Sequence, residues 1–359
     1  MKTWQIRTSS LKTSTILFRR GLRNLVDAQD IVALGLPVAI IGDPTVLPRF
    51  EPLVGRLADQ GHSVTIHPLA IGEAKKDLAT AAELYQWLGQ QGVRRDTVVI
   101  AVGGGVLTDT VGYVAATYLR GLTWIAVPTT LLGQVDAAIG GKVAVNVPWG
   151  KNLVGAFHLS DMVLIDPEVL DTLPLREWQA GVGEVMKSAL IAGGWLWDRL
   201  NNSAPPFGTA DWDDLIRHTV EIKVNIVNAD LEEHDQRMHL NFGHTVAHGL
   251  EQALGYGKLT HGEAVAMGCR VALSISENLL GLDPNVRWTV EQWMRVWELP
   301  LAVPDVDWDR VLAAMTQDKK ARAHGLQWIL LEQVGHPVIR RDIDEGLVRS
   351  AMERILGAR

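Results

Sequence analysis

Residues 96–119 read DTVVIAVGGGVLTDTVGYVAATYL, and this stretch indicates the fold class. It opens with a β-branched run, 96–102, that is typical of a buried strand, and a helical pattern follows from Val111 to Leu119. The glycine triplet 103–105 joins the two. Glycine lets a pyrophosphate approach the backbone, and the N-terminus of the next helix offers unpaired N–H groups. The triplet departs from the GxGxxG pattern, so a plain strand-to-helix turn is an equally good interpretation.

The same alternation extends outward on both sides of this stretch. Further β-branched runs lie at 38–41, 64–66, 124–127 and 163–165, and helical patterns occur up to Gln60 and over 75–91. Strands that alternate with helices predict a parallel sheet of the Rossmann-like, dinucleotide-binding kind, with sites beyond the carboxyl ends of the strands. Asp43 follows the first run and is a candidate acceptor for ribose hydroxyls, although Asp before Pro is also an ordinary turn residue.

The alternation stops at Pro174. Helical patterns then cover 175–191, 213–228, 242–254, 263–279 and 286–297, and a short hairpin is expected at 328–331 and 338–339. We therefore predict an α/β dinucleotide-binding domain over residues 1–170 and an all-α C-terminal domain over residues 171–359. The boundary is expected between 167 and 174.

Three of the eleven histidines lie in the stretch 241–263, NFGHTVAHGLEQALGYGKLTHGE. His244 and His248 are four apart and share one face of a helix, and His261 precedes the next helical pattern. Imidazole is the commonest protein ligand for a divalent transition metal, so the three predict a metal site. Histidines that are satisfied in an apolar core are the alternative. The zinc-protease pattern of two histidines around a glutamate is missing, which disfavours peptide hydrolysis.

Basic residues among apolar neighbours suggest an anionic substrate. Lys142 and Lys151 lie in the glycine-rich stretch 128–157. Glu184 and Lys187 are three apart on a mostly apolar helix, where the carboxylate is a candidate metal ligand or, with equal weight, half of a helical ion pair. The other cations of this kind are Lys223, Arg237 and the pair Lys319 and Lys320. Together they favour a phosphorylated, carboxylated substrate.

Composition excludes several other classes of protein. The apolar fraction of 47% and the charged fraction of 21% are typical of a soluble globular chain, and a net charge of −7 argues against nucleic acid as a partner. The single cysteine, Cys269, excludes an internal disulfide. The first residues, MKTWQIRTSS, lack the apolar core of a signal peptide, and no stretch has transmembrane length. A cytoplasmic location without membrane contact is the expectation.

Seven segments together resemble the 3-dehydroquinate synthase family of the sugar-phosphate cyclase superfamily. They are GGGVLTD (103–109), PTTLLGQVD (128–136), GGK (140–142), GKNLVGAF (150–157), GEVMKS (183–188), LNFGHTVAH (240–248) and HGEAVAMG (261–268). The resemblance spans nearly the whole chain. It implies an NAD-binding α/β domain joined to a helical, metal-binding domain in a homodimer. The implied reaction converts 3-deoxy-D-arabino-heptulosonate 7-phosphate to 3-dehydroquinate and phosphate in the shikimate pathway.

The resemblance also implies a role for individual residues. Glu184, His244 and His261 match ligands of zinc or cobalt, which replaces the three-histidine interpretation and leaves His248 to contact substrate. The residues that match NAD-binding positions are Asp43, Glu73, Lys76, Gly104, Gly105, Val106, Asp109, Thr129, Thr130, Lys142, Lys151 and Thr172. The catalytic and substrate-binding set is Asp136, Lys142, Lys151, Asn152, Lys187, Lys223, Arg237, Asn241, His248 and Lys319 or Lys320. Arg120 matches an arginine that binds phosphate in the partner subunit.

The implied mechanism uses NAD transiently. Oxidation of C5 to a ketone acidifies the neighbouring C–H so that phosphate can leave, and the ketone is then reduced again. Ring opening and an intramolecular aldol closure follow, with His248 and the lysines as expected proton relays. The chain departs from the family at Ala137 and Ala138, where serine is common, at Val143 in place of threonine, and at 107–108, where Leu-Thr replaces Ile-Gly.

Three other functions are compatible with parts of this pattern. Related sugar-phosphate cyclases close sedoheptulose 7-phosphate or glucose 6-phosphate, but those tend to change the segment that holds Asn241 and His248, and both residues are present here. Metal-dependent polyol dehydrogenases release NADH, but the many lysines favour a phosphorylated substrate. A non-catalytic NAD-binding protein would not need the three ligand-type residues.

Overall fold

The computed structural model describes residues 1–7, 12–25, 27–202, 206–255, 257–303, 306–321, 326–341 and 343–357. The side chains of Lys319 and Lys320, on helix α11 (Trp308–Ala321), lie outside this description. Two compact units are present, one formed by Met1–Leu173 with Gly208–Leu231 and the other by Pro174–Phe207 with Glu232–Arg359.

Compared with the predicted division into residues 1–170 and 171–359, the first segment of unit one ends slightly later, at Leu173, and this unit also includes Gly208–Leu231. Helix α7 (Trp212–Ala229) packs with the first unit, although it follows the predicted boundary. Its exposed face supplies an ion pair from Glu221 to Lys2, and Asn228 donates a hydrogen bond to the Gln5 carbonyl. A helix that returns to an earlier domain leaves no local signal in the sequence, because its amphipathic pattern does not specify which core it covers.

The first unit is built on a mixed sheet of seven described strands in the order β1-β2-β9-β6-β5-β3-β4. Strands β1 and β2 are antiparallel, and every other neighbouring pair is parallel, which confirms the predicted fold class. The strands are β1 (Lys2–Arg7), β2 (Thr13–Phe18), β3 (Val38–Gly42), β4 (Val64–Pro68), β5 (Val98–Gly103), β6 (Thr123–Pro128) and β9 (Met162–Ile165).

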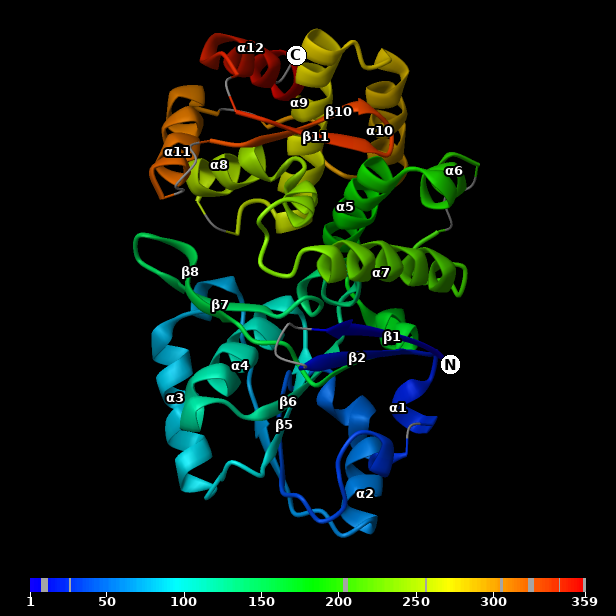
Figure 1. Cartoon of the computed structure of the whole chain (residues 1–359), viewed down its shortest axis with the longest axis vertical. Helices are drawn as coiled ribbons and strands as arrows, with labels where there is room; N and C mark the ends of the chain where they lie inside the picture. The colour runs from blue at the N-terminus through cyan, green and yellow to red at the C-terminus, as the bar shows by residue number, and fades with distance from the viewer. Residues whose placement is uncertain are drawn as a thin grey trace. The chain divides into compact units, whose positions relative to one another are not determined.

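Helices cover both faces of this sheet (Figure 1). Helices α3 (Leu78–Gln90) and α4 (Gly105–Thr117) lie on one side, and α1 (Leu22–Leu25) and α2 (Glu51–Asp59) on the other. Strands β3 and β5 are therefore buried along their whole length. The chain runs from β3 outward to β4 and then back to β5, so the strand order reverses between β3 and β5. In open parallel sheets, ligands usually bind at the carboxyl ends of the two strands between which the order reverses.

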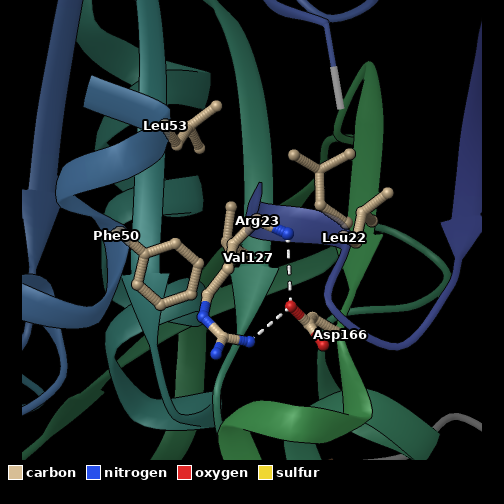
Figure 2. A pocket seen from close by; sticks show the side chains of 7 residues that line it. Leu22, Arg23, Phe50, Leu53, Val127 and Asp166 are labelled. Carbon is tan, nitrogen blue, oxygen red and sulfur yellow. Dashed lines mark hydrogen bonds and ion pairs between the residues drawn. The ribbon is translucent and has the colours of Figure 1, made fainter. Parts of the chain in front are cut away.

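Asp166, which directly follows β9, ties the end of this strand to the first helix. Its carboxylate accepts hydrogen bonds from the backbone N–H groups of Gly21 and Glu168, and it pairs with Arg23 at 2.7 Å (Figure 2). The adjacent cavity, between Phe50, Leu53 and this ion pair, has a volume of about 10 Å³ and has room for one water molecule at most. This part of the sheet end is therefore packed and closed.

Two irregular segments complete the first unit. A hairpin joins β7 (Lys142–Val147) to β8 (Gly150–Phe157), and a π-helical turn, η5, covers Gly133–Ala137. Single π-helical turns are rare and are frequent at functional sites. Both segments fall within the glycine-rich stretch 128–157, for which no strand or helix was predicted.

The second unit surrounds helix α9 (His261–Leu280), which is buried continuously from Gly262 to Ser276. The helical C-terminal domain is thus confirmed, with the expected hairpin, β10 (Trp328–Gln333) and β11 (His336–Arg340), packed among the helices. The remaining helices are α5 (Leu175–Ala192), α6 (Gly194–Asn202), α8 (His244–Leu254), α10 (Pro284–Val296), α11 and α12 (Glu345–Leu356). None of the described helices is long and apolar enough to cross a membrane.

Candidate active site

Helices α5 and α9 approach each other at glycines. A Cβ built on Gly262 would lie 1.8 Å from the Ala180 carbonyl oxygen, and one on Gly183 would lie 2.2 Å from the Gly262 carbonyl oxygen. No side chain fits at either position, because the neighbouring atoms belong to backbone. This contact places Glu184, the residue after Gly183, against His261, the residue before Gly262.

Helices α8 and α9 meet in the same way. A Cβ on Gly268 would lie 2.0 Å from the Gly243 carbonyl oxygen, and Gly243 itself has a φ of +80°, in the left-handed region that favours glycine. His244 begins α8 directly after this turn. Glycines next to Glu184, His244 and His261 in the sequence thus bring three helices close enough for these side chains to converge.

The converging side chains are Glu184, His244 and His261, with ligand-type atoms all within 4.8 Å of one another. The Glu184 Oε1 atom lies 3.5 Å from Nε2 of His261 and 3.8 Å from Nε2 of His244. The Glu184 side chain is 1% exposed, and neither of its oxygens has a hydrogen-bond partner in the described part of the chain, although Lys187 forms an ion pair with it. A buried carboxylate is costly without positive charge, and the Lys187 ammonium leaves Oε1, the oxygen that faces the two imidazoles, available for a metal ion. Two imidazoles and one carboxylate suit zinc or cobalt.

The ring nitrogens of both histidines are oriented alike. Nδ1 of His244 lies 3.3 Å from the Phe242 carbonyl oxygen, and Nδ1 of His261 lies 3.5 Å from Oε2 of Glu251. Each ring therefore turns Nε2 toward Glu184. Sequence analysis did not single out Glu251, although it follows His244 by seven residues on α8 and so shares its face.

His248 lies beside this group. Its ring centroid is 5.6 Å from that of His244 and 6.2 Å from that of His261. It also forms a second possible ligand group with Glu251 and His261. All three predicted histidines are therefore brought together, and Glu184 adds a buried carboxylate to two of them.

We expect Gly262→Ala to weaken both folding and metal binding. Because a Cβ 1.8 Å from a backbone oxygen can be relieved only by moving α5 away from α9, the free energy of unfolding should fall by about 1–3 kcal/mol. Denaturant unfolding measures this change. Gly55→Ala on α2 is the matched control, since nothing lies within 4 Å of its Cβ position. Equal unfolding free energies for the two variants would contradict the close contact.

In the first unit, Lys76 links the predicted NAD-binding residue Asp109 to Asn152, a residue of the predicted substrate-binding set. Its Nζ donates to Oδ2 of Asp109 at 2.6 Å and to Oδ1 of Asn152 at 2.7 Å. Burial raises the pKa of Asp109, and the neighbouring Lys76 ammonium opposes this shift. Lys76 is itself buried, so this group holds the tip of the β7–β8 hairpin in place through Asn152.

Glu73 forms a second link to the same hairpin. Its Oε1 accepts from Asn146 at 2.8 Å and lies 3.4 Å from the Lys151 ammonium. Burial alone would raise the pKa of Glu73, but the charges of Lys151 and Lys76 outweigh this effect and the net shift is downward. Glu73 is therefore ionised at neutral pH and fixes the position of Lys151.

The π-helical turn η5 places Asp136 in contact with Lys223 on α7. The Lys223 Nζ donates both to the carbonyl oxygen and to Oδ1 of Asp136, each at 2.6 Å.

Ala137, one of the departures from the family, faces the glycine triplet, because a Cβ on Gly105 would lie 2.9 Å from the Ala137 Cβ. A Cβ on Gly104 would similarly meet Thr130 at 2.9 Å. Close packing therefore requires glycine at both positions of this turn.

Several predicted NAD-binding residues lie at the carboxyl end of the sheet. Gly104 caps helix α4 without a side-chain hydrogen bond, Val106 lies in the first turn of that helix, and Thr129 and Thr130 follow β6. Asp43 follows β3 and accepts from the backbone and hydroxyl of Thr45 at 2.8 and 2.6 Å, which is the turn arrangement that the sequence also allowed. Thr172 accepts a hydrogen bond from Arg49 at 2.7 Å.

The remaining predicted residues differ in exposure. Arg237 is 2% exposed on the 3-10 helix η7 (Gln236–Asn241), and Asn241 at its end donates to Oε1 of Glu233 at 2.7 Å. Lys142, at the start of β7, and Arg120, at the end of the 3-10 turn η4 (Tyr118–Arg120), are exposed.

These features define a class of enzymes in which a dinucleotide-type parallel sheet accompanies a helical unit with a His–His–Glu group of the kind that binds metal ions. Family models for the N-terminal and C-terminal parts of 3-dehydroquinate synthase match residues 66–180 and 181–321. The chain belongs to the 3-dehydroquinate synthase family and is a carbon–oxygen lyase. A 3-dehydroquinate synthase of Streptococcus pneumoniae is 38% identical over 319 residues, which is 87% of this chain and 90% of that protein.

Solved structures of two other synthases share the fold of this chain. A 2-epi-5-epi-valiolone synthase from Streptomyces hygroscopicus subsp. jinggangensis, with NAD⁺ and Zn²⁺ bound, is 28% identical with a TM-score of 0.87, over 98% of this chain and 99% of that one. A 2-deoxy-scyllo-inosose synthase, complexed with carbaglucose-6-phosphate, NAD⁺ and Co²⁺, shares the fold at 24% identity and a TM-score of 0.85, over 99% and 100% of the two chains.

Proposed function

We propose that the chain converts 3-deoxy-D-arabino-heptulosonate 7-phosphate to 3-dehydroquinate and phosphate, with NAD and one divalent metal ion as cofactors. Family membership over most of the chain supports the reaction. The observation that carries the proposal is the buried carboxylate of Glu184, whose Oε1 faces the Nε2 atoms of His244 and His261. A related cyclase with NAD⁺ and Zn²⁺ bound supports both cofactors.

In this proposal Glu184, His244 and His261 hold the metal ion. Two imidazoles and a carboxylate leave further coordination positions open for substrate oxygens. When bound, a zinc or cobalt ion supplies Lewis acidity, which lowers the pKa of hydroxyl groups that coordinate it. Lys187, whose ammonium pairs with Glu184, balances part of the buried charge of the site.

The first unit binds NAD at the carboxyl ends of β3, β5 and β6. The uncapped N-terminus of α4 offers N–H groups to the pyrophosphate, and Asp43 and Asp109 are acceptors for hydroxyl groups. Lys76, Glu73 and the hairpin residue Asn152 fix this region through the contacts described above. When bound, NAD supplies a hydride acceptor that is regenerated within the turnover.

The remaining polar residues bind the substrate and move protons. Five cations neutralise its carboxylate and phosphate: Lys142, Lys151, Lys187, Lys223 and Arg237. Asp136, Asn152 and Asn241 orient its hydroxyl groups by hydrogen bonds. His248 is positioned beside the metal-type ligands and serves as the proton relay for ring opening and aldol closure. We also propose that the protein is a homodimer located in the cytoplasm.

The structural likeness to a 2-epi-5-epi-valiolone synthase makes a related sugar-phosphate cyclase the second candidate.

We expect phosphate release from 3-deoxy-D-arabino-heptulosonate 7-phosphate to require NAD without any net production of NADH. The physical reason is that the ketone formed before elimination is reduced again before product leaves. Absorbance at the NADH band and a phosphate assay, run together, measure both quantities. Release only from sedoheptulose 7-phosphate would favour the other cyclase, and stoichiometric NADH would indicate a polyol dehydrogenase.

A further inference from the structure

Glu251 is a buried carboxylate that the proposed mechanism does not use. It is 4% exposed and faces the histidine group from α8. Its Oε2 lies 3.5 Å from Nδ1 of His261, while Nε2 of the same ring lies 3.5 Å from Oε1 of Glu184. The lone pairs of the two ring nitrogens diverge. A carboxylate that contacts Nδ1 therefore lies outside the coordination shell of a metal ion that binds at Nε2.

We propose that Glu251 is a positioning residue for the metal site, which rests on the proposed function. It accepts a hydrogen bond from Nδ1–H of His261, keeps Nε2 free of a proton and directs that nitrogen toward Glu184. Ligating histidines nearly always donate their second N–H to a carboxylate or a backbone carbonyl. Both kinds of partner are present here, since the Phe242 carbonyl takes this role for His244.

A second metal ion is the competing interpretation, because His248, Glu251 and His261 also form a possible ligand group. Two ions would share His261, one on each ring nitrogen, and the ring would then have to lose both of its N–H protons. A single ion at Nε2 needs only the neutral ring, whose one proton lies between Nδ1 and Glu251. The geometry therefore favours Glu251 as a hydrogen-bond acceptor, and its negative charge increases the basicity of Nε2.

Cobalt binding to the metal-free chain tests this proposal without any assay of turnover. Titration against a competing chelator gives Kd, and the visible spectrum of Co²⁺ reports the ligand geometry. Glu251→Ala should weaken Co²⁺ binding by about 10–100-fold and shift the spectrum. Glu251→Gln, whose amide oxygen can accept the same hydrogen bond without the charge, should have an intermediate Kd. Gln252→Ala, an exposed neighbour on α8, should bind as the natural chain does.

Three results would overturn the proposal. One is a Glu251→Ala chain with the natural Kd and spectrum. Another is two Co²⁺ ions per natural chain, one of them lost in Glu251→Ala, which would make Glu251 a ligand. The third is a natural chain that binds no Co²⁺, which would refute the proposed metal site itself. Should Glu251→Ala fail to fold, Glu251→Gln provides the test. A natural Kd and spectrum in this variant would overturn the proposal, and weaker Co²⁺ binding would support it.

Discussion

The His261→Ala chain should purify with almost no bound zinc or cobalt, under conditions in which the natural chain holds about one ion. His261 supplies one of three proposed protein ligands, and its loss leaves the buried Glu184 carboxylate with one imidazole and the ammonium of Lys187. A site of this kind binds a divalent ion far more weakly, because the lysine competes for the carboxylate. Turnover should be lost together with the metal.

Metal analysis after dialysis provides the measurement, and His336→Ala is the matched control. His336 is an exposed histidine on β11 of the same unit, so its loss tests whether any histidine removal disturbs the ion content. Full metal retention in His261→Ala, with a natural content in the control, would exclude His261 from the ligand set. Thermal unfolding of both metal-free variants separates ligand loss from misfolding.

Local patterns in the sequence were sufficient for the class of fold. The runs at 38–41 and 96–102 predicted strands of a parallel sheet, the second of the buried type, and both β3 and β5 are buried along their length. Strands β1 and β2 were not predicted. Their sequences, KTWQIR and TSTILF, are short and partly polar, and they pair with each other at the sheet edge. Strand order depends on tertiary packing, so it could not be obtained from periodicity.

The histidine group was only partly predictable for a related reason. The spacing of His244 and His248 on one helix face is a local feature, and the sequence showed it directly. The approach of Glu184 to His261 depends on a contact between Gly183 and Gly262, which are far apart in the chain. The residue patterns left Glu184 as either a metal ligand or half of an ion pair, and the family resemblance was needed to place it in the ligand set instead of His248. Glu251 had a local signal, its seven-residue spacing from His244, that was not used.

Arg120→Ala should inactivate the enzyme by removing a phosphate contact that one subunit supplies to its partner, in the proposed homodimer. Arg120 follows Leu119 in a turn where both residues have left-handed backbones, with φ of 66° and 50°. Such conformations cost of order 1–3 kcal/mol each for residues other than glycine and cluster at functional positions. Within the described residues the exposed Arg120 side chain forms no hydrogen bond or ion pair. An arginine near a helix C-terminus is also mildly favourable by itself, which is the alternative explanation.

The structure thus leaves the Arg120 guanidinium free to reach a ligand outside its own unit, and the family resemblance implies that this ligand is the substrate phosphate in the partner. Loss of two parallel charge-assisted hydrogen bonds should lower kcat/KM by at least about 100-fold. Arg94→Ala, an exposed arginine of the same unit that pairs with Asp96, is the matched control and should be nearly fully active. Equal activities of the two variants would support the alternative explanation.

Complementation tests whether the contact crosses between subunits. Homodimers of Arg120→Ala and of His244→Ala should each be nearly inactive, the first for lack of the phosphate contact and the second for lack of metal. In a mixed dimer, the Arg120→Ala subunit keeps its own metal ligands and receives the intact Arg120 of the other subunit. One complete site per mixed dimer should therefore restore turnover. A purified mixed dimer that is as inactive as both parents would show that Arg120 acts within its own subunit.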